Sequence, residues 1–226
     1  ALSQFDLVLT TPQYGLPELD NVVVMPVPFV SLKNVSEDQL KHFHSAWAHL
    51  PKPWILGVIG GGKFPIGMDD EALIGFGRAL NTRATQLGGS VVLLDSPRSR
   101  KGAIEIVGGQ LSSAQCIHKR GEGPNPYQPA LKLCDELCVT SDSVSMVADM
   151  LDNGKPTWVY KLESSSFALN WSAKAGLGES LARLGVLHPP RDVDGFMNKL
   201  LQQGIVGDLT KGVPPHCKFM AGDERQ

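Results

Sequence analysis

One stretch, 137–160, constrains the fold more than any other part of the sequence. It begins with a short apolar run of β-prone residues, Leu137 to Thr140, and continues through a polar turn into an amphipathic helical pattern. Gly154 and Pro156 then stop the helix before the next β-prone run. A strand, a helix and a strand in this order predict a βαβ unit, whose two strands run parallel.

The turn inside this unit consists of three polar residues, Ser141, Asp142 and Ser143. Their side-chain oxygens can cap the start of the following helix. A turn that leads from the carboxyl end of a parallel strand into a helix is also where α/β proteins bind anions such as nucleotide phosphates. A well-capped crossover without any ligand is the alternative, and both interpretations stay open at this point.

The same alternation of strands and helices extends over residues 54–160 and predicts a doubly wound parallel α/β sheet, which is a Rossmann-like fold. Helical patterns separate five β-prone runs, at Trp54–Ile59, Ser90–Leu94, Ala114–His118, Leu137–Thr140 and Thr157–Tyr160. Five parallel strands are enough for one complete domain. We expect the loops that follow them to emerge at the same edge of the sheet.

The rest of the chain divides around this domain. Two β-prone runs precede it, and they are too few for a domain of their own, so residues 1–50 are expected to be the remnant of a preceding Rossmann-like domain plus a linking helix. The Pro51-Lys52-Pro53 segment is the expected boundary. Residues 51–206 then form the main domain, and the polar residues 207–226 are expected to be a loose tail.

Composition excludes several classes of protein. The chain has 226 residues, 19% of them charged, and a net charge of −2, which argues against a nucleic-acid-binding protein. No apolar run is long enough to span a membrane, and neither a signal peptide nor a transit peptide is visible. We therefore expect a cytoplasmic protein with a processed or trimmed N-terminus, and peripheral contact with a membrane stays open.

The cysteines and histidines predict neither disulfides nor a metal site. The four cysteines lack Cys-x-x-Cys spacing, so free thiols in a reducing compartment are expected. His42, His44 and His49 share one short segment, but no carboxylate or cysteine is spaced to complete a metal site with them.

A glycine-rich turn, Gly60, Gly61 and Gly62, follows the first strand of the main domain. It does not complete a Walker A motif, because Phe64 stands where Ser or Thr would bind magnesium. It does not complete a dinucleotide fingerprint either, because Pro65 replaces the third glycine. The turn still offers backbone N–H groups that could approach a phosphate, and its alternative is a tight turn that requires positive φ.

Two further polar loops are candidates for ligand binding. Ser96 and Arg98 follow the second strand, where an arginine suits a phosphate or carboxylate, and a solvated basic loop is the alternative. Asn125 and Tyr127 lie in a rigid loop before a helix, which Asn125 could cap, while Tyr127 could stack on a base or sugar. Asp95, at the end of the second strand, could hold a ribose.

Three segments resemble a known family: GEGPNPYQPAL at 121–131, TSDSVSMVADMLDNGKPTWVYKL at 140–162, and IGGGK at 59–63. They are similar to the mitochondrial fission proteins named for the elongated-mitochondria phenotype in plants, whose bacterial members carry the label of predicted nucleoside-diphosphate-sugar epimerases. The resemblance runs from about Phe5 to Leu187. It implies a glycosyltransferase-like fold of the GT-B type, in which two Rossmann-like domains face a cleft, with this chain supplying mainly the C-terminal one.

The resemblance also implies a set of site residues. The run from Asp142 to Asp149, followed by Gly154-Lys155-Pro156, resembles the donor-binding run of the peptidoglycan UDP-N-acetylglucosamine transferase. Asp149 takes the place of the glutamate that binds ribose there. The glycine turn and the helix start would meet the diphosphate through Gly60, Gly61, Gly62, Ser141, Ser143 and Ser145, while Asp142 would cap the helix or meet a sugar hydroxyl.

The function expected from this resemblance is binding of a nucleotide-diphosphate sugar such as a UDP-sugar, with glycosyl transfer as the reaction and no cofactor required. The catalytic base is not identified, because the acceptor half of such enzymes is mostly absent from this chain. A non-catalytic interaction protein is the first alternative, since plant members of the family recruit a dynamin-like GTPase. An NAD(P)-dependent oxidoreductase is the second, and it depends on Asp95 and the glycine turn alone.

Overall fold

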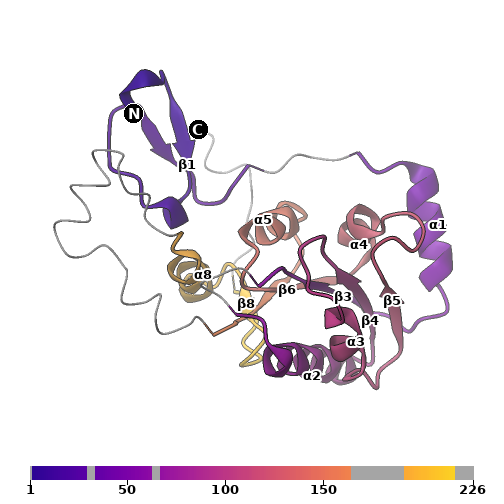
Figure 1. Cartoon of the computed structure of the whole chain (residues 1–226). Coiled ribbons are helices and arrows are strands. Elements are labelled where there is room, and N and C mark those ends of the chain that lie inside the picture. The colour runs from indigo at the N-terminus through magenta and orange to yellow at the C-terminus, as the bar shows by residue number, and fades with distance from the viewer. Residues whose placement is uncertain (1, 30–33, 63–66, 164–190, 217–226) are drawn as a thin grey trace.

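The computed structural model describes residues 2–29, 34–62, 67–163 and 191–216, and Figure 1 shows their arrangement. The helix expected near residues 179–184 lies outside these ranges. In chain order the elements are η1 (Leu2–Gln4), β1 (Val8–Thr10), η2 (Pro12–Tyr14), β2 (Val22–Val24), α1 (Glu37–Trp47), β3 (Trp54–Ile59), α2 (Asp70–Leu87), β4 (Ser90–Asp95), α3 (Ala103–Gly108), β5 (Gln115–His118), α4 (Tyr127–Leu133), β6 (Glu136–Thr140), α5 (Val144–Asp152), β7 (Thr157–Tyr160), α8 (Val193–Gln202) and β8 (Gly207–Asp208).

The five parallel strands expected from the sequence form one sheet, in the order β5-β4-β3-β6-β7, and β8 adds a sixth strand at its edge. The doubly wound α/β prediction is therefore confirmed. The prediction of a polar tail from residue 207 is wrong at its start, because Gly207 pairs with Trp158 and Asp208 with Val159. A strand of two residues is too short to show an alternating pattern, so only pairing with β7 reveals it.

Helices cover both faces of this sheet and bury two separate cores. On one face α1, α4, α5 and α8 pack against the strands, and on the other α2 and α3 do so (Figure 1). Every residue of β3 is buried, as expected for the central strand of a parallel sheet that is covered on both sides. The continuous apolar run in the sequence is explained by this double burial.

Helix α1 belongs to the main core rather than to the segment before it. Its capping box is present as expected, with Gln39 N–H donating to Ser36 Oγ and Ser36 N–H donating to Gln39 Oε1. Trp47 is fully buried and packs edge-to-face on Trp54 of β3, with ring centroids 5.9 Å apart. The expected boundary at residues 51–53 therefore lies inside one packed unit.

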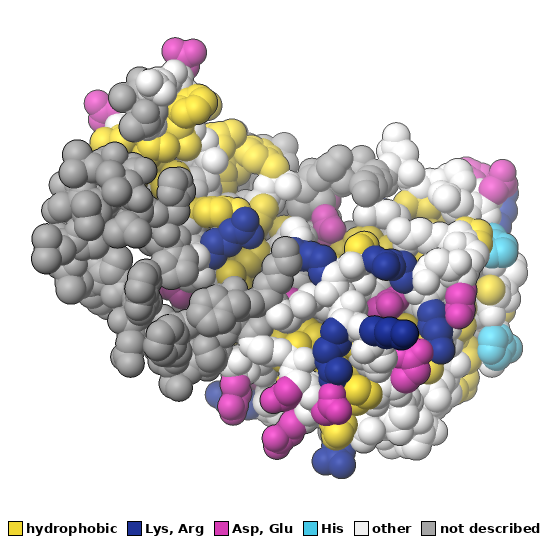
Figure 2. All heavy atoms as spheres, viewed as in Figure 1, with side chains coloured by type: hydrophobic (Ala, Val, Ile, Leu, Met, Phe, Trp, Pro, Cys, Tyr) yellow, Lys and Arg dark blue, Asp and Glu magenta, His cyan; other side chains and the backbone are white. Residues whose placement is uncertain are grey.

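The N-terminal residues form a small two-stranded parallel sheet of β1 and β2. The neighbouring helix η2 contacts the start of α8 through a hydrogen bond of 2.8 Å from Asp192 N–H to Gln13 O and through the Arg191 guanidinium over the Tyr14 ring. Figure 2 shows hydrophobic side chains gathered over this unit. The exposed large ones include Phe5, Leu7, Leu9, Leu19, Val23, Val24 and Phe29.

The described thiols are free, in agreement with the sequence-based prediction. Burial raises the pKa of Cys134 to about 12, and burial also raises the pKa of Cys138 well above its usual value. Cys217 lies outside the described residues. Within the described ranges, no group of three His, Cys, Asp or Glu side chains is placed to hold a metal, and no helix is both long and apolar enough to cross a bilayer.

The contact between Trp47 and His118 predicts a dependence of stability on pH. Trp47 Nε1 donates to His118 Nε2 at 2.9 Å, so the imidazole must be neutral, and burial lowers the pKa of His118 below 6.5. Glu122 opposes this shift and His42 adds to it. Because the unfolded chain takes up this proton first, the stabilisation is complete above pH 6.5 and is lost as pH falls through the lowered pKa of the folded protein.

We expect urea unfolding to show this loss in the wild-type chain and in a His49→Gln control, since His49 is exposed. In the His118→Gln variant, that part of the pH dependence should disappear. An unchanged slope in His118→Gln would mean that other groups carry the acid sensitivity.

Candidate functional site

Three loops meet where adjacent parallel strands end. Ile59 pairs with Asp95 across β3 and β4, and Val58 pairs with Val139 across β3 and β6, so the residues that follow these strands emerge at one edge. The predicted convergence of Gly60, Ser96 and Ser141 is therefore confirmed. The strand order reverses between β3 and β6, and such a switch point is where open α/β sheets form a crevice for ligands.

The glycine turn is held by the Asp142 carboxylate. Gly61 N–H and Gly62 N–H both donate to Asp142 Oδ2, at 2.7 Å and 2.9 Å. Thr140 Oγ1 donates to Asp142 Oδ1 at 2.6 Å and itself accepts from Gly60 N–H at 2.9 Å. Two of the backbone donors expected to approach a phosphate are thus already bound to an acid of the chain itself.

These contacts explain why glycine occurs at each position of the turn. A Cβ on Gly60 would overlap the Asp142 carboxylate, and a Cβ on Gly61 would lie 2.5 Å from Arg98 Cβ. Gly62 has a φ of 54°, which lies in the left-handed region that side chains rarely adopt. The tight-turn interpretation of the sequence therefore applies here.

The expectation that Ser141, Asp142 or Ser143 caps α5 is wrong. Ser143 occupies the N-cap position without a capping hydrogen bond from its side chain. Ser141 Oγ instead accepts from Leu162 N–H at 3.0 Å, and Ser143 Oγ accepts from Arg98 Nη2 at 3.1 Å. Each side chain binds a neighbouring loop, which a local capping rule cannot anticipate. The first turn of α5, which includes the exposed Ser145, is thus left without a side-chain cap.

The loop after β4 places an arginine beside this uncapped helix start. Ser99, which sequence reasoning did not single out, donates from Oγ to Ile59 O and Gly60 O at 2.8 Å and 2.9 Å. Ser96 N–H donates to Ser99 Oγ at 2.8 Å. Ser99 thus joins the loop after β4 to the glycine turn after β3. Among the described residues Arg98 has no carboxylate partner, whereas Arg100 forms a salt bridge with Asp70.

Tyr127 and Asp149 bind each other. Tyr127 OH donates to Asp149 Oδ2 at 3.0 Å, and burial, reinforced by the charge of Asp149, raises the pKa of Tyr127 far above its usual value. Asn125 Oδ1 accepts from Tyr127 N–H at 3.0 Å, but Pro126 occupies the N-cap position of α4 and no side chain caps this helix, so the predicted capping by Asn125 is wrong. A ribose hydroxyl would have to share the Asp149 carboxylate with this phenol, and base stacking by Tyr127 would need its largely buried ring to be accessible.

Asp95 is also engaged within the chain. Its Oδ1 accepts from Arg120 N–H at 2.9 Å, and Arg120 Nη1 donates to Pro97 O at 2.9 Å. The acid on which an NAD-binding interpretation depends is thus used to join two loops of the protein.

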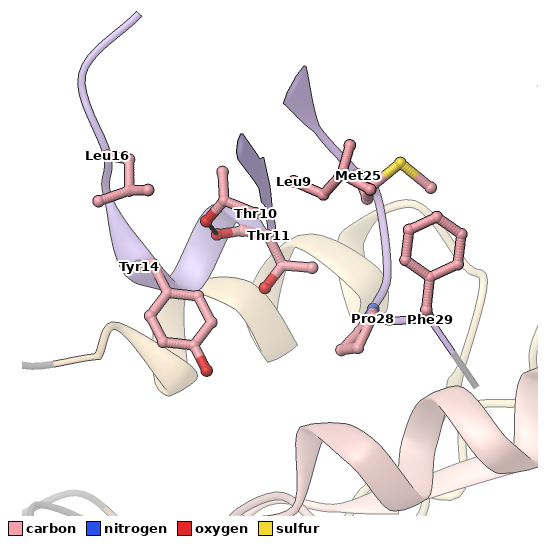
Figure 3. Close-up of a pocket in the computed structure, with 8 residues that line it drawn as sticks. All are labelled: Leu9, Thr10, Thr11, Tyr14, Leu16, Met25, Pro28 and Phe29. Atoms are coloured by element: carbon pink, nitrogen blue, oxygen red, sulfur yellow. Dashed lines mark hydrogen bonds between the residues drawn. The ribbon is translucent and has the colours of Figure 1, made fainter. Parts of the chain in front are cut away.

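A separate open hollow of about 370 Å³ lies in the small N-terminal unit (Figure 3). It is lined by Leu9, Thr10, Thr11, Tyr14, Leu16, Met25, Pro28 and Phe29. Its walls come from the ends of β1 and β2 and from η2, and most of its side chains are apolar. None of the predicted site residues lines it.

Comparison with known proteins places the chain in a family. The model for the family described as mitochondrial fission ELM1 matches residues 1–206. The chain belongs to this family. No curated protein matches it. Among solved structures it is similar to a glycosyl transferase of family 9 from Veillonella parvula, with 13% identity and a TM-score of 0.45 over 75% of this chain and 53% of the other. The chain thus spans about half the length of that protein.

The packing of Gly60 against Asp142 predicts the effect of a single methyl group. Gly60→Ala should push the carboxylate off Gly61 N–H and Gly62 N–H and lower the free energy of unfolding by about 1–3 kcal/mol. Gly67→Ala is the matched control, because a Cβ there meets nothing within 4 Å. Urea denaturation of both variants measures the difference, and equal stabilities would show that Asp142 does not hold the turn.

Proposed function

We propose that this chain binds a nucleotide-diphosphate sugar at the carboxyl edge of the large sheet, as the donor-binding part of a GT-B-like protein. The observation that carries the proposal is the position of Arg98, whose guanidinium lies against Ser143 at the uncapped start of α5 without a carboxylate partner among the described residues. A cation and free helix N–H groups at a strand-order switch suit a phosphate.

The groups available at this edge divide into two kinds. Arg98 and the backbone N–H groups of the first turn of α5, near Ser143 and Ser145, would bind the phosphates. The side chains of Ser96 and Ser141 are engaged in the loops themselves and would support the site indirectly. In this proposal Asp149 reaches the ribose while it keeps its hydrogen bond to Tyr127, and Asn125 positions Tyr127 for that role.

Glycosyl transfer is the reaction that we propose for the bound sugar nucleotide. Departure of a nucleoside diphosphate builds negative charge on its phosphates, and Arg98 with the helix start would stabilise that charge. The described part of the chain offers no residue that we assign as the catalytic base.

A non-catalytic interaction role is favoured by a different observation, the exposed apolar surface of the β1–β2 unit. Phe5 is 61% exposed and Phe29 is 68% exposed, and a contiguous apolar patch marks an interaction surface more often than a catalytic one. An oxidoreductase role has no such support, since the Asp95 carboxylate already binds Arg120 N–H.

The ligand class is tested by thermal unfolding. UDP or a UDP-sugar should stabilise the protein by about 2.7 kcal/mol at a hundredfold excess over the dissociation constant, because only the folded chain binds it. NAD is the comparison ligand and should produce no shift. The absence of stabilisation by every nucleoside diphosphate tested would remove the proposal.

The role of Arg98 is tested by titration calorimetry with UDP. Arg98→Met should weaken binding about tenfold, because a charged hydrogen bond to phosphate is lost. Arg100→Met is the matched control in the same loop and should leave the affinity unchanged, since Arg100 is paired with Asp70. Equal effects of the two substitutions would show that the loop attracts anions only through its overall charge.

A further inference from the structure

We propose that Asp142 makes the affinity of the site depend on the charge of the bound phosphate. It would favour an intact nucleotide sugar over the more highly charged nucleoside diphosphate. This inference rests on the proposed function, because it concerns the same three loops. In a nucleotide sugar each phosphate carries one negative charge. In a nucleoside diphosphate the terminal phosphate loses a second proton with a pKa of about 6 and carries nearly two charges at neutral pH.

The Asp142 carboxylate is fixed in place. It accepts hydrogen bonds from Gly61 N–H, Gly62 N–H and Thr140 Oγ1, at 2.7, 2.9 and 2.6 Å. Thr140 is fully buried, and its hydroxyl is itself held by Gly60 N–H. Asp142 lies in the turn two residues after the end of β6, and its three donors hold the carboxylate in place when a ligand arrives, unlike an acid without such partners.

Its negative charge is also not neutralised by a side chain. Among the described residues no Lys, Arg or His forms a salt bridge with Asp142. Arg98 donates to the hydroxyl of the adjacent Ser143 instead. A phosphate held by Arg98 and the start of α5 would therefore lie beside a fixed negative charge. Repulsion between the two grows with the charge of the phosphate, and the charge of the half-buried Asp142 is screened less than that of an exposed acid.

This arrangement would favour transfer of the sugar from the nucleotide to an acceptor over the reverse reaction. The substrate enters with singly charged phosphates, which Arg98 and the helix start can balance. The bond between the sugar C1 and the terminal phosphate oxygen breaks and leaves its electron pair on that oxygen, so the nucleoside diphosphate carries the additional charge. The hydroxyl oxygen of the acceptor forms the new bond to C1, and its proton passes to solvent. Asp142 would then weaken binding of the product and favour its release.

The experiment compares UDP and UDP-glucose by titration calorimetry with the wild-type chain, Asp142→Asn and the control Asp152→Asn. Asn keeps an oxygen for the glycine N–H groups and removes the charge, and Asp152 lies at the far end of α5. We expect Asp142→Asn to bind UDP about fivefold more tightly than the wild-type chain does, and the affinity for UDP-glucose to change much less. Asp152→Asn should leave both affinities as they are.

A second measurement needs no variant. Wild-type affinity for UDP should rise as pH is lowered from about 7.5 to about 5.5, because the terminal phosphate takes up a proton, while that for UDP-glucose stays flat. Equal pH profiles for the two ligands, or equal effects of Asp142→Asn on both, would overturn the role of Asp142 while leaving the proposed function intact. If neither nucleotide binds the wild-type chain, the proposed function fails and this inference fails with it.

Discussion

The two hydrogen-bond ladders of β3 are the constraint on which the rest of the structure depends. This strand is buried along its whole length and pairs with β4 on one side and β6 on the other. Because parallel ladders align the strand ends, they bring the three following loops to one edge. The helices on both faces then bury the two cores that hold β3 in place.

At that edge the protein supplies an anion of its own. The donors of the glycine turn, which resemble a phosphate cradle in sequence, are bound by Asp142. A carboxylate in this position stabilises the turn, and in the proposed function it would confine the phosphate to the side of Arg98 and α5. The structural and the ligand-binding interpretations of the glycine turn are therefore linked, since the same acid stabilises the turn and sets the charge beside the proposed ligand.

The small β1–β2 unit has a different character. Two parallel strands cannot bury their own apolar side chains, since parallel sheets are normally covered on both faces. Its exposed residues form the largest gathering of hydrophobic side chains visible in Figure 2, next to a main domain whose surface mixes both signs of charge. A partner-binding role would be located here, on residues other than those of the proposed nucleotide site.

The sequence by itself determined the class of the fold, because the periods of its apolar residues and its Gly and Pro stops depend on local geometry. It predicted the five main strands and the capping box at Ser36. Only the tertiary structure decided which acids are engaged within the chain, that Ser99 joins two loops, and that β8 completes the sheet. These contacts join residues far apart in the chain, and no local pattern records which distant donor a carboxylate will meet.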